Sequence, residues 1–173
     1  MKLEHLYRGF PGHPLHPPLT DATIGAYTFA TIAATLSVLG IANDAAAKAW
    51  ALALVIGLIV NGPTALTGLL DWLKIARGTP LFRTATTHFI VMDVVLVLFL
   101  IAAILGYSDG MDGVVEAAPY VFTLAGFLLL TFGGWLGGTI VFTHGMRVLN
   151  LIEEPASRVV SPVPQPEEES AEK

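Results

Sequence analysis

Four long apolar segments constrain the fold of this chain more than any other feature. They cover about residues 19–41, 47–73, 84–107 and 117–143. Each comes close to the roughly 20 residues that a helix needs to cross the hydrocarbon core of a bilayer. A soluble domain of 173 residues, 54% of them hydrophobic and 13% charged, could not bury that much apolar side chain, because a small protein keeps much of its surface exposed. The sequence therefore predicts an integral membrane protein.

Short links between the apolar segments predict how the helices are arranged. Helices joined by short links pack as antiparallel neighbours, so we expect an all-α fold, an up-down four-helix bundle within residues 19–150. Residues 1–18 are rich in proline and histidine, and the prolines favour an extended or turned segment there. No signal peptide is evident, because the first apolar run is too long and lies too far from the amino terminus. We therefore expect this run to remain as a span.

Lysine and arginine are distributed unevenly over the two sides of the predicted bundle. The side with both termini and the second link carries most of them: Lys2, Arg8, Lys74, Arg77, Arg83, Arg147, Arg158 and Lys173. The opposite side carries Lys48 alone. Positive charge marks the cytoplasmic side of a membrane protein. The sequence therefore predicts that both termini lie in the cytoplasm.

Composition also limits the kinds of bond, metal ligand and partner that are expected for this chain. Residues 151–173 are rich in proline and glutamate, and such a segment cannot bury enough apolar surface to offset its chain entropy. We expect a disordered, solubilising tail there. The chain has no cysteine, which excludes disulfides and thiolate metal ligands. It has no basic stripe with interleaved aromatic residues, so nucleic acid is not expected as a partner.

Histidines and carboxylates form the candidate site. Under the predicted topology all five histidines fall on the side of the termini: His5, His13, His16, His88 and His144. The same half of the bundle carries three aspartates: Asp21, Asp71 and Asp93. Asp93 lies roughly 7–8 Å beyond His88 along a helix. A carboxylate at that depth is costly and usually faces the interior, so we expect Asp93 to face the bundle.

Glycines mark one face of the last apolar segment. Gly126, Gly133 and Gly137 align with His144, since intervals of seven and eleven residues nearly complete whole helical turns. Glycine at such spacing usually allows close helix packing in lipid, which is the interpretation we favour. A second interpretation is compatible with it, because one edge of the same groove could admit a flat ligand such as a porphyrin.

Two redox or metal hypotheses follow from these residues. In the first, His88 and His144 are the axial ligands of one b-type haem used in membrane electron transfer, and Gly133 and Gly137 border the ring. In the second, imidazoles and carboxylates bind zinc or non-haem iron directly. The residues that would serve as metal ligands, or support the haem, are His13, His16, Asp21, Asp71 and Asp93. All histidines lie on one side, so at most one such site is expected.

Plainer interpretations stay open beside these hypotheses. The cluster could be a hydrogen-bond network in a non-catalytic subunit of a larger membrane complex, with no cofactor. Asp21 could be a first-turn acid in a helix capped by Thr20. No nucleophile is paired with a base at a recognisable spacing, so the sequence does not predict an enzymatic reaction. The bilayer is the expected environment, and a redox partner or a second copy of the chain are further candidate partners.

An ordered set of short motifs resembles a known family. The motifs are His13–Pro17, Gly68–Trp72, Gly134–Gly138 and His144–Gly145. Together they resemble the bacterial membrane family known as domain of unknown function 2231, over about Gly9 to Val148. The resemblance implies a four-helix domain in the bacterial plasma membrane and an association with di-haem cytochrome-like folds and redox domains. It implies no established activity. The start of the first span is less apolar here than the family pattern suggests.

Overall fold

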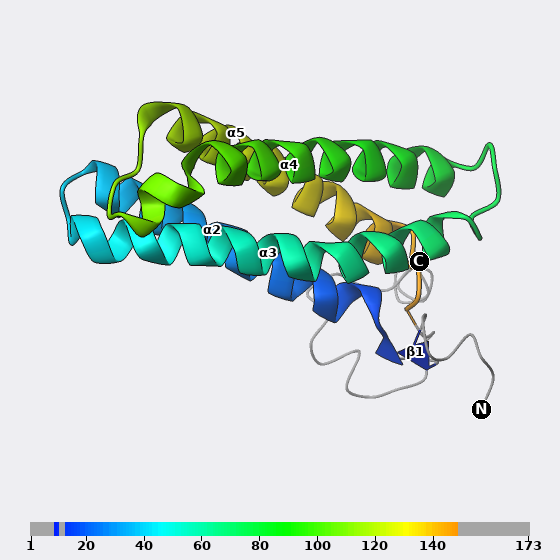
Figure 1. The fold of residues 1–173 in the computed structure, drawn as a ribbon. Coiled ribbons are helices and arrows are strands. Elements are labelled where there is room, and N and C mark those ends of the chain that lie inside the picture. Colours follow the sequence, from blue (N-terminus) through cyan, green and yellow to red (C-terminus); the bar gives the residue numbers. More distant parts are fainter. Residues whose placement is uncertain (1–8, 11–12, 149–173) are drawn as a thin grey trace, which may run out of the picture.

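Four long helices make up almost all of the computed structural model, which describes residues 9–10 and 13–148 (Figure 1). The predicted all-α fold with four helices is confirmed. The predicted tail at 151–173 and His5 lie outside the described residues. The elements in chain order are β1 (Gly9–Phe10), β2 (His13–Pro14), α2 (His16–Val38), α3 (Asn43–Trp72), α4 (Pro80–Met111), α5 (Ala117–Gly138) and the π-helical turn η1 (Thr139–Thr143).

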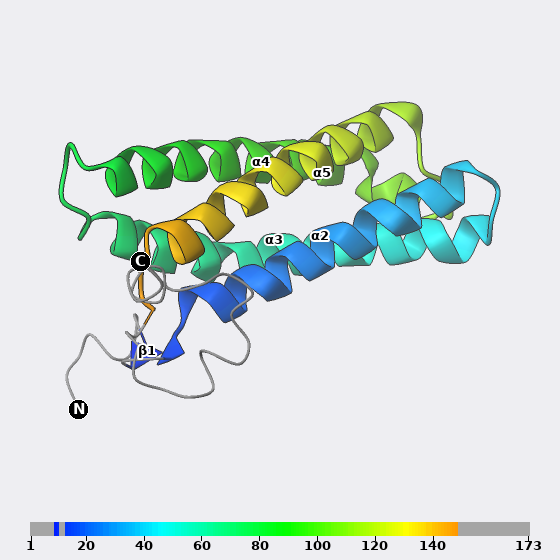
Figure 2. The same cartoon turned by 180° about the vertical axis from the view of Figure 1, so that it is seen from behind.

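The four helices lie side by side along one common direction. The α3–α4 link lies at one end, and the α2–α3 and α4–α5 links lie at the other (Figure 1). Seen from behind, α2 and α5 cover the face opposite α3 and α4 (Figure 2). The most extensive contacts join α2 to α3 and α4 to α5. We call the end where α2 and α4 begin, and where α3 and η1 finish, the histidine end.

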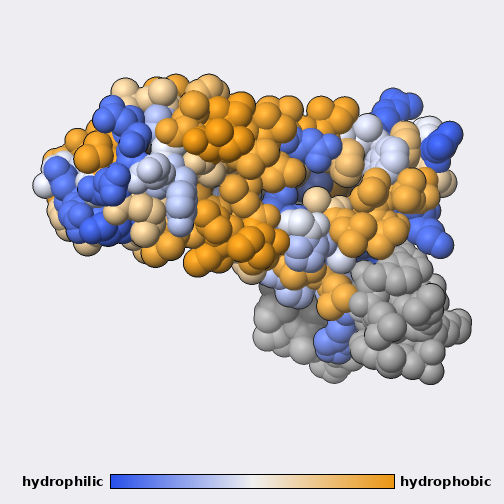
Figure 3. Space-filling view, in the orientation of Figure 1, coloured by the Kyte–Doolittle hydropathy of each residue, from blue (hydrophilic) through white to orange (hydrophobic). Residues whose placement is uncertain are grey.

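Three helical segments are long and apolar enough to cross a membrane. They are Asn43–Trp72, Pro80–Met111 and Ala117–Thr143, with mean hydropathies of 1.8, 2.9 and 1.7 over their most apolar stretches. Apolar residues gather over the middle of the molecule and hydrophilic residues toward its two ends (Figure 3). The first expected span is also a helix, α2. It is more polar than the other three, because threonine and serine recur along it.

Two helix starts show how proline and threonine set the boundaries at the histidine end. α2 begins at His16, with prolines in its first turn, so the expectation of a non-helical segment up to residue 18 is wrong there. Proline is tolerated at that position because the missing N–H would have no intrahelical partner. α4 begins at Pro80, where the Thr79 hydroxyl caps the helix by accepting a hydrogen bond from the Phe82 N–H at 3.1 Å.

The link between α2 and α3 is shorter than the sequence suggested. α3 begins at Asn43, inside the segment expected as a link. Gly40 has φ +78° and Ala42 has φ 50°, so two left-handed residues reverse the chain within a few positions. Glycine adopts this conformation without a steric penalty, whereas alanine does so at a cost.

The core contains three large aromatic residues among alanines. Tyr27, Trp50 and Phe99 are all fully buried. The Tyr27 and Phe99 rings stack with centroids 3.9 Å apart, and the Trp50 indole N–H donates to the Thr123 hydroxyl at 3.1 Å. Tyr27 lies roughly 16 Å along α2 from His16. An apolar aromatic core thus fills the bundle beyond the polar residues of the histidine end.

Candidate functional site

His16 is held by the backbone of α3. Its Nδ1 lies 3.0 Å from the Thr64 carbonyl oxygen and 3.2 Å from the Thr67 hydroxyl. A carbonyl oxygen can only accept, so Nδ1 carries the proton and donates it, and Nε2 of the neutral ring is left with a lone pair. Gly68 allows this approach, because a Cβ there would lie 2.8 Å from the His16 ring. The ring orientation is therefore fixed by α3.

Buried threonines continue this contact between α2 and α3. The Thr23 and Thr64 hydroxyls lie 2.9 Å apart, and the Thr64 hydroxyl is also 3.2 Å from the Leu19 carbonyl. Asn61 is buried one turn earlier on the same face of α3. The helical spacing of Asn61, Thr64, Gly68 and Asp71 thus corresponds to a face of α3 that packs against α2, with polar side chains toward the histidine end.

His88 is held in the same manner by α5. Its Nδ1 lies 2.9 Å from the Gly133 carbonyl oxygen, so Nδ1 again donates to the backbone. A Cβ at Gly137 would lie 3.4 Å from the His88 ring, and one at Gly133 would lie 2.6 Å from the Met92 sulfur. Side chains of α4 thus fill the space beside these glycines, which fits the helix-packing interpretation. The expected role of Gly133 and Gly137 in holding a cofactor stays a prediction.

His16 and His88 come from different helices into the same part of the bundle. A long-range electrostatic interaction links the two rings, another links His16 to Asp71, and no hydrogen bond between described residues joins the two histidines. We call His16 and His88 the imidazole pair. Each ring presents its Nδ1 to a backbone carbonyl. The Nε2 of His16 lies 3.5 Å from the Thr20 hydroxyl, and no hydrogen bond between described residues engages the Nε2 of His88. An imidazole held this way is a ready metal ligand.

His144 lies nearer the end of the bundle than His88. It follows η1, where the His144 N–H donates to the Thr139 carbonyl at 3.2 Å, five residues back. Its Nε2 lies 3.2 Å from the Thr84 hydroxyl, and Thr84 precedes His88 by one turn of α4. No hydrogen bond between described residues joins His88 to His144, and their predicted pairing as axial ligands stays a prediction.

An ion pair connects the segment after η1 to α3. Arg147 Nη2 lies 2.7 Å from Asp71 Oδ1, and 9% of the Asp71 side chain is exposed. Arg147 has φ 65°, a left-handed conformation that is uncommon for a long side chain. The ion pair helps to offset that cost. It also places a cation beside the carboxylate that acts on His16.

Comparison with known proteins identifies the family to which the chain belongs. The family model described as "Predicted membrane protein (DUF2231)" matches residues 12–150, more than three-quarters of the sequence. The chain belongs to this family. No curated protein and no solved structure matches it. The family description supports a membrane location and assigns no activity.

The remaining predicted site residues of this DUF2231 chain lie apart from the imidazole pair. His13, in β2, and Asp21 are exposed. Asp93 is also exposed, on the outer face of α4, so the expectation that it faces the interior is wrong. Val95 points into the core, and two residues turn a helix by roughly 200°. Thr20 does not cap α2, because the helix begins earlier; its hydroxyl donates to the His16 carbonyl at 2.9 Å.

The described residues give no support to a metal site made by the protein alone. Over residues 9–10 and 13–148, no three side chains of histidine, aspartate or glutamate converge on a position that could hold a metal ion. Zinc in proteins normally takes three or four protein ligands. The hypothesis of zinc or non-haem iron bound by these histidines and carboxylates is therefore not supported.

Two contacts of the site were missed by reasoning from the sequence. Thr67 shares the Nδ1 proton of His16 with the Thr64 carbonyl, and Arg147 binds Asp71. The position of Thr67, three residues after Thr64 on the polar face of α3, was an available signal. Arg147 entered only as a charge that orients the chain, because nothing in its surroundings indicates a left-handed residue.

Asp71→Asn is expected to loosen the segment after η1. The change removes the charge that holds Arg147, so we expect the free energy of unfolding to fall by about 1–2 kcal/mol. Amide hydrogen exchange over residues 144–148 should become faster, which mass spectrometry of the purified protein would measure.

The matched control is Asp44→Asn. Asp44 pairs with Lys48 at 2.7 Å, but 69% of its side chain is exposed, so its loss should cost less than about 0.5 kcal/mol. Equal exchange over 144–148 in both variants would contradict the anchoring role of Asp71.

Proposed function

We propose that this membrane protein binds one b-type haem at the histidine end and takes part in membrane electron transfer. One observation carries the proposal. In the imidazole pair, His16 and His88 each donate Nδ1–H to a backbone carbonyl, at 3.0 and 2.9 Å. The Nε2 of His88 is then left for a ligand, and the Nε2 of His16 would exchange its contact with the Thr20 hydroxyl, at 3.5 Å, for one. Axial histidines of haem proteins are oriented by such hydrogen bonds to the second ring nitrogen.

The donor set suits haem better than a bare metal ion. The porphyrin itself supplies four nitrogen ligands, so the protein needs to add only one or two. Two imidazoles meet that need. His144 is the alternative partner for His88, in keeping with the pairing predicted from the sequence. When bound, the haem would supply one-electron redox chemistry.

The protein residues of the site would orient the ligand and set its electrostatics. The carbonyls of Thr64 and Gly133 fix the two rings, and a hydrogen bond from Nδ1–H makes each Nε2 a stronger base. The Asp71 carboxylate interacts with His16, and its charge is partly offset by the ion pair with Arg147. The excess of lysine and arginine on this side supports our placing both termini in the cytoplasm, so that the redox partner would dock from there.

An optical spectrum of the purified protein tests the proposal. The chain is expressed with added haem precursor, purified in detergent and scanned in its oxidised and reduced forms. We expect a Soret band and a low-spin spectrum, and we expect His16→Ala or His88→Ala to lower the haem content several-fold or to convert the spectrum to high-spin. His13→Ala is the control, because His13 is exposed in β2 and its loss should leave the spectrum unchanged.

Three results would count against parts of the proposal. Protein that folds, as judged by circular dichroism, but shows no Soret band would overturn haem binding. A low-spin spectrum that survives His16→Ala and is lost in His144→Ala would assign the ligands to His88 and His144 instead. Equal haem loss in all three variants and in His13→Ala would indicate nonspecific binding.

A further inference from the structure

Asp93 lies on the outer face of α4, within the apolar length of that helix. α4 is long and apolar enough to cross a membrane. The nearest aspartate, glutamate, lysine or arginine residues along it are Arg83 and Asp109, roughly 15 Å and roughly 24 Å from Asp93 along the helix axis. An aspartate side chain is too short to extend to the bilayer surface as a lysine or arginine does. In a bilayer the carboxylate would therefore face the acyl chains of the lipid.

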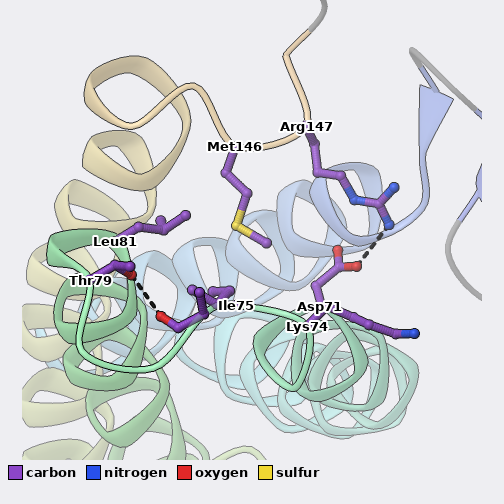
Figure 4. A pocket seen from close by; sticks show the side chains of 8 residues that line it. Asp71, Lys74, Ile75, Thr79, Leu81, Met146 and Arg147 are labelled. Carbon is purple, nitrogen blue, oxygen red and sulfur yellow. Dashed lines mark hydrogen bonds and ion pairs between the residues drawn. The ribbon is translucent and has the colours of Figure 1, made fainter.

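Asp93 also has no partner within the described part of the chain. Asp71 pairs with Arg147 at 2.7 Å (Figure 4). Asp44 pairs with Lys48 at 2.7 Å. No hydrogen bond or ion pair between described residues engages the Asp93 carboxylate. Carboxylates within membrane spans are costly, and they usually face the interior or pair with another group. A partner for Asp93 would have to come from another molecule.

Exposed apolar side chains flank Asp93 in a stripe along α4. They are Ile90, Val97, Leu100 and Ile104. From residue 90 to residue 104 the intervals alternate between three and four, which is the spacing of a seam along which one helix packs against another. A single polar residue in such a seam selects the partner and its register. We call these five residues the α4 stripe.

Charge decides which kind of helix fits the α4 stripe. Copies of this chain insert in the same direction, so a second copy would place its own Asp93 at the same depth and would bring no opposite charge. None of the cations among the described residues lies at that depth, because they all lie toward the ends of the bundle: Lys48, Lys74, Arg77, Arg83 and Arg147. Charge complementarity therefore favours a helix of a different protein.

We propose that the α4 stripe docks a membrane-spanning helix of a partner protein, and that this helix carries a lysine or arginine that pairs with Asp93. The apolar residues of the stripe would pack against apolar residues of the partner helix. Asp93 would fix the depth of that helix and select against helices without a cation, since these would leave the carboxylate unpaired. This proposal does not depend on haem binding, because Asp93 lies apart from the imidazole pair.

A synthetic helix tests the proposal with the full chain in phosphatidylcholine vesicles. The probe is a membrane-spanning polyleucine peptide with one lysine at the depth of Asp93, and the comparison peptide has leucine there. The chain has no cysteine, so Ser108→Cys on the exposed end of α4 provides one site for a fluorescent donor. Energy transfer to an acceptor on the peptide measures binding. We expect the lysine peptide to bind about 5-fold more tightly, or better.

A pair of charge variants assigns this preference to Asp93. Asp93→Asn should abolish the preference for the lysine peptide, because the attraction between opposite charges is lost. Asp109→Asn is the matched control, since Asp109 is exposed near the end of the same helix, and it should leave the preference unchanged. Equal binding of the two peptides to the unmodified stripe, or equal effects of the two variants, would overturn the proposal.

A pair of packing variants locates the contact on the stripe. Val97→Trp enlarges a stripe residue, whereas Val121→Trp makes the same change at an exposed valine of α5. We expect weaker binding of the lysine peptide only with Val97→Trp, and equal effects would contradict docking on α4. Mixing two differently labelled copies of the chain tests the other occupant. Energy transfer between copies that is lost in Asp93→Asn, and that the lysine peptide does not reduce, would assign the stripe to a second copy and overturn the proposal.

Discussion

Trp50→Ala is expected to lower the free energy of unfolding by about 3 kcal/mol or more, because it leaves a cavity in a rigid part of the bundle. Trp50 is fully buried. Gly106 and Gly110 of α4 pack directly on its ring, since a Cβ at either position would come within 2.8 Å of it. These glycines cannot extend to fill the space that the indole leaves. The substitution also removes the donor to the Thr123 hydroxyl. Unfolding in mixed micelles with increasing sodium dodecyl sulfate, followed by circular dichroism, would measure the loss.

Trp135→Ala is the matched control for this prediction. Trp135 is 66% exposed on α5, where lipid or detergent contacts the ring in both the folded and the unfolded chain. The same change of residue should therefore cost less than about 1 kcal/mol at this position. Similar losses at the two tryptophans would show that the tightly packed surroundings of Trp50 do not determine stability.

Gly57→Ala is expected to destabilise the bundle by about 1–3 kcal/mol through overpacking. A Cβ at Gly57 would lie 2.5 Å from the Tyr27 ring, which real contacts do not allow. The Tyr27 ring cannot move back, because its other face stacks on Phe99 with centroids 3.9 Å apart. α2 and α3 would have to separate. The same micelle titration, or the midpoint of thermal unfolding, would measure the effect.

Gly25→Ala on α2 provides the control. Nothing lies within 4 Å of a Cβ at Gly25, so the new methyl group meets open space. Alanine is a better helix former than glycine by up to about 1 kcal/mol, and this variant should be neutral or slightly stabilised. Two variants that change stability in the same direction would contradict close packing at Gly57.

Most of the fold could be predicted from segment length and hydropathy. The four helices follow from four apolar runs long enough to span a bilayer. The exact ends could not be predicted, because they depend on local details. α3 starts at Asn43 only because Gly40 and Ala42 adopt left-handed conformations. α2 starts at His16 because prolines fit a first helical turn.

Only those features of the candidate site that depend on helical periodicity, such as which residues share a helix face, could be predicted from the sequence. The intervals between Thr64, Gly68 and Asp71 place them on one face of α3, where Thr64 and Gly68 contact α2 and Asp71 binds Arg147. His88 and Asp93 are five residues apart, about 140° around a helix, and they do not face the same neighbour. Periodicity says nothing about which helix lies opposite a face. The proximity of His16 to His88 therefore needed the three-dimensional packing.

The aromatic core makes the two halves of the bundle unlike each other. Tyr27, Trp50 and Phe99 leave no surface of their own exposed, and together they join three of the four helices, α2, α3 and α4. The bundle is therefore filled by side chains beyond the histidine end and is not an open channel. A ligand bound near His16 therefore has no open path along the bundle axis past these three rings. It would have to enter and leave on its own side of the aromatic core.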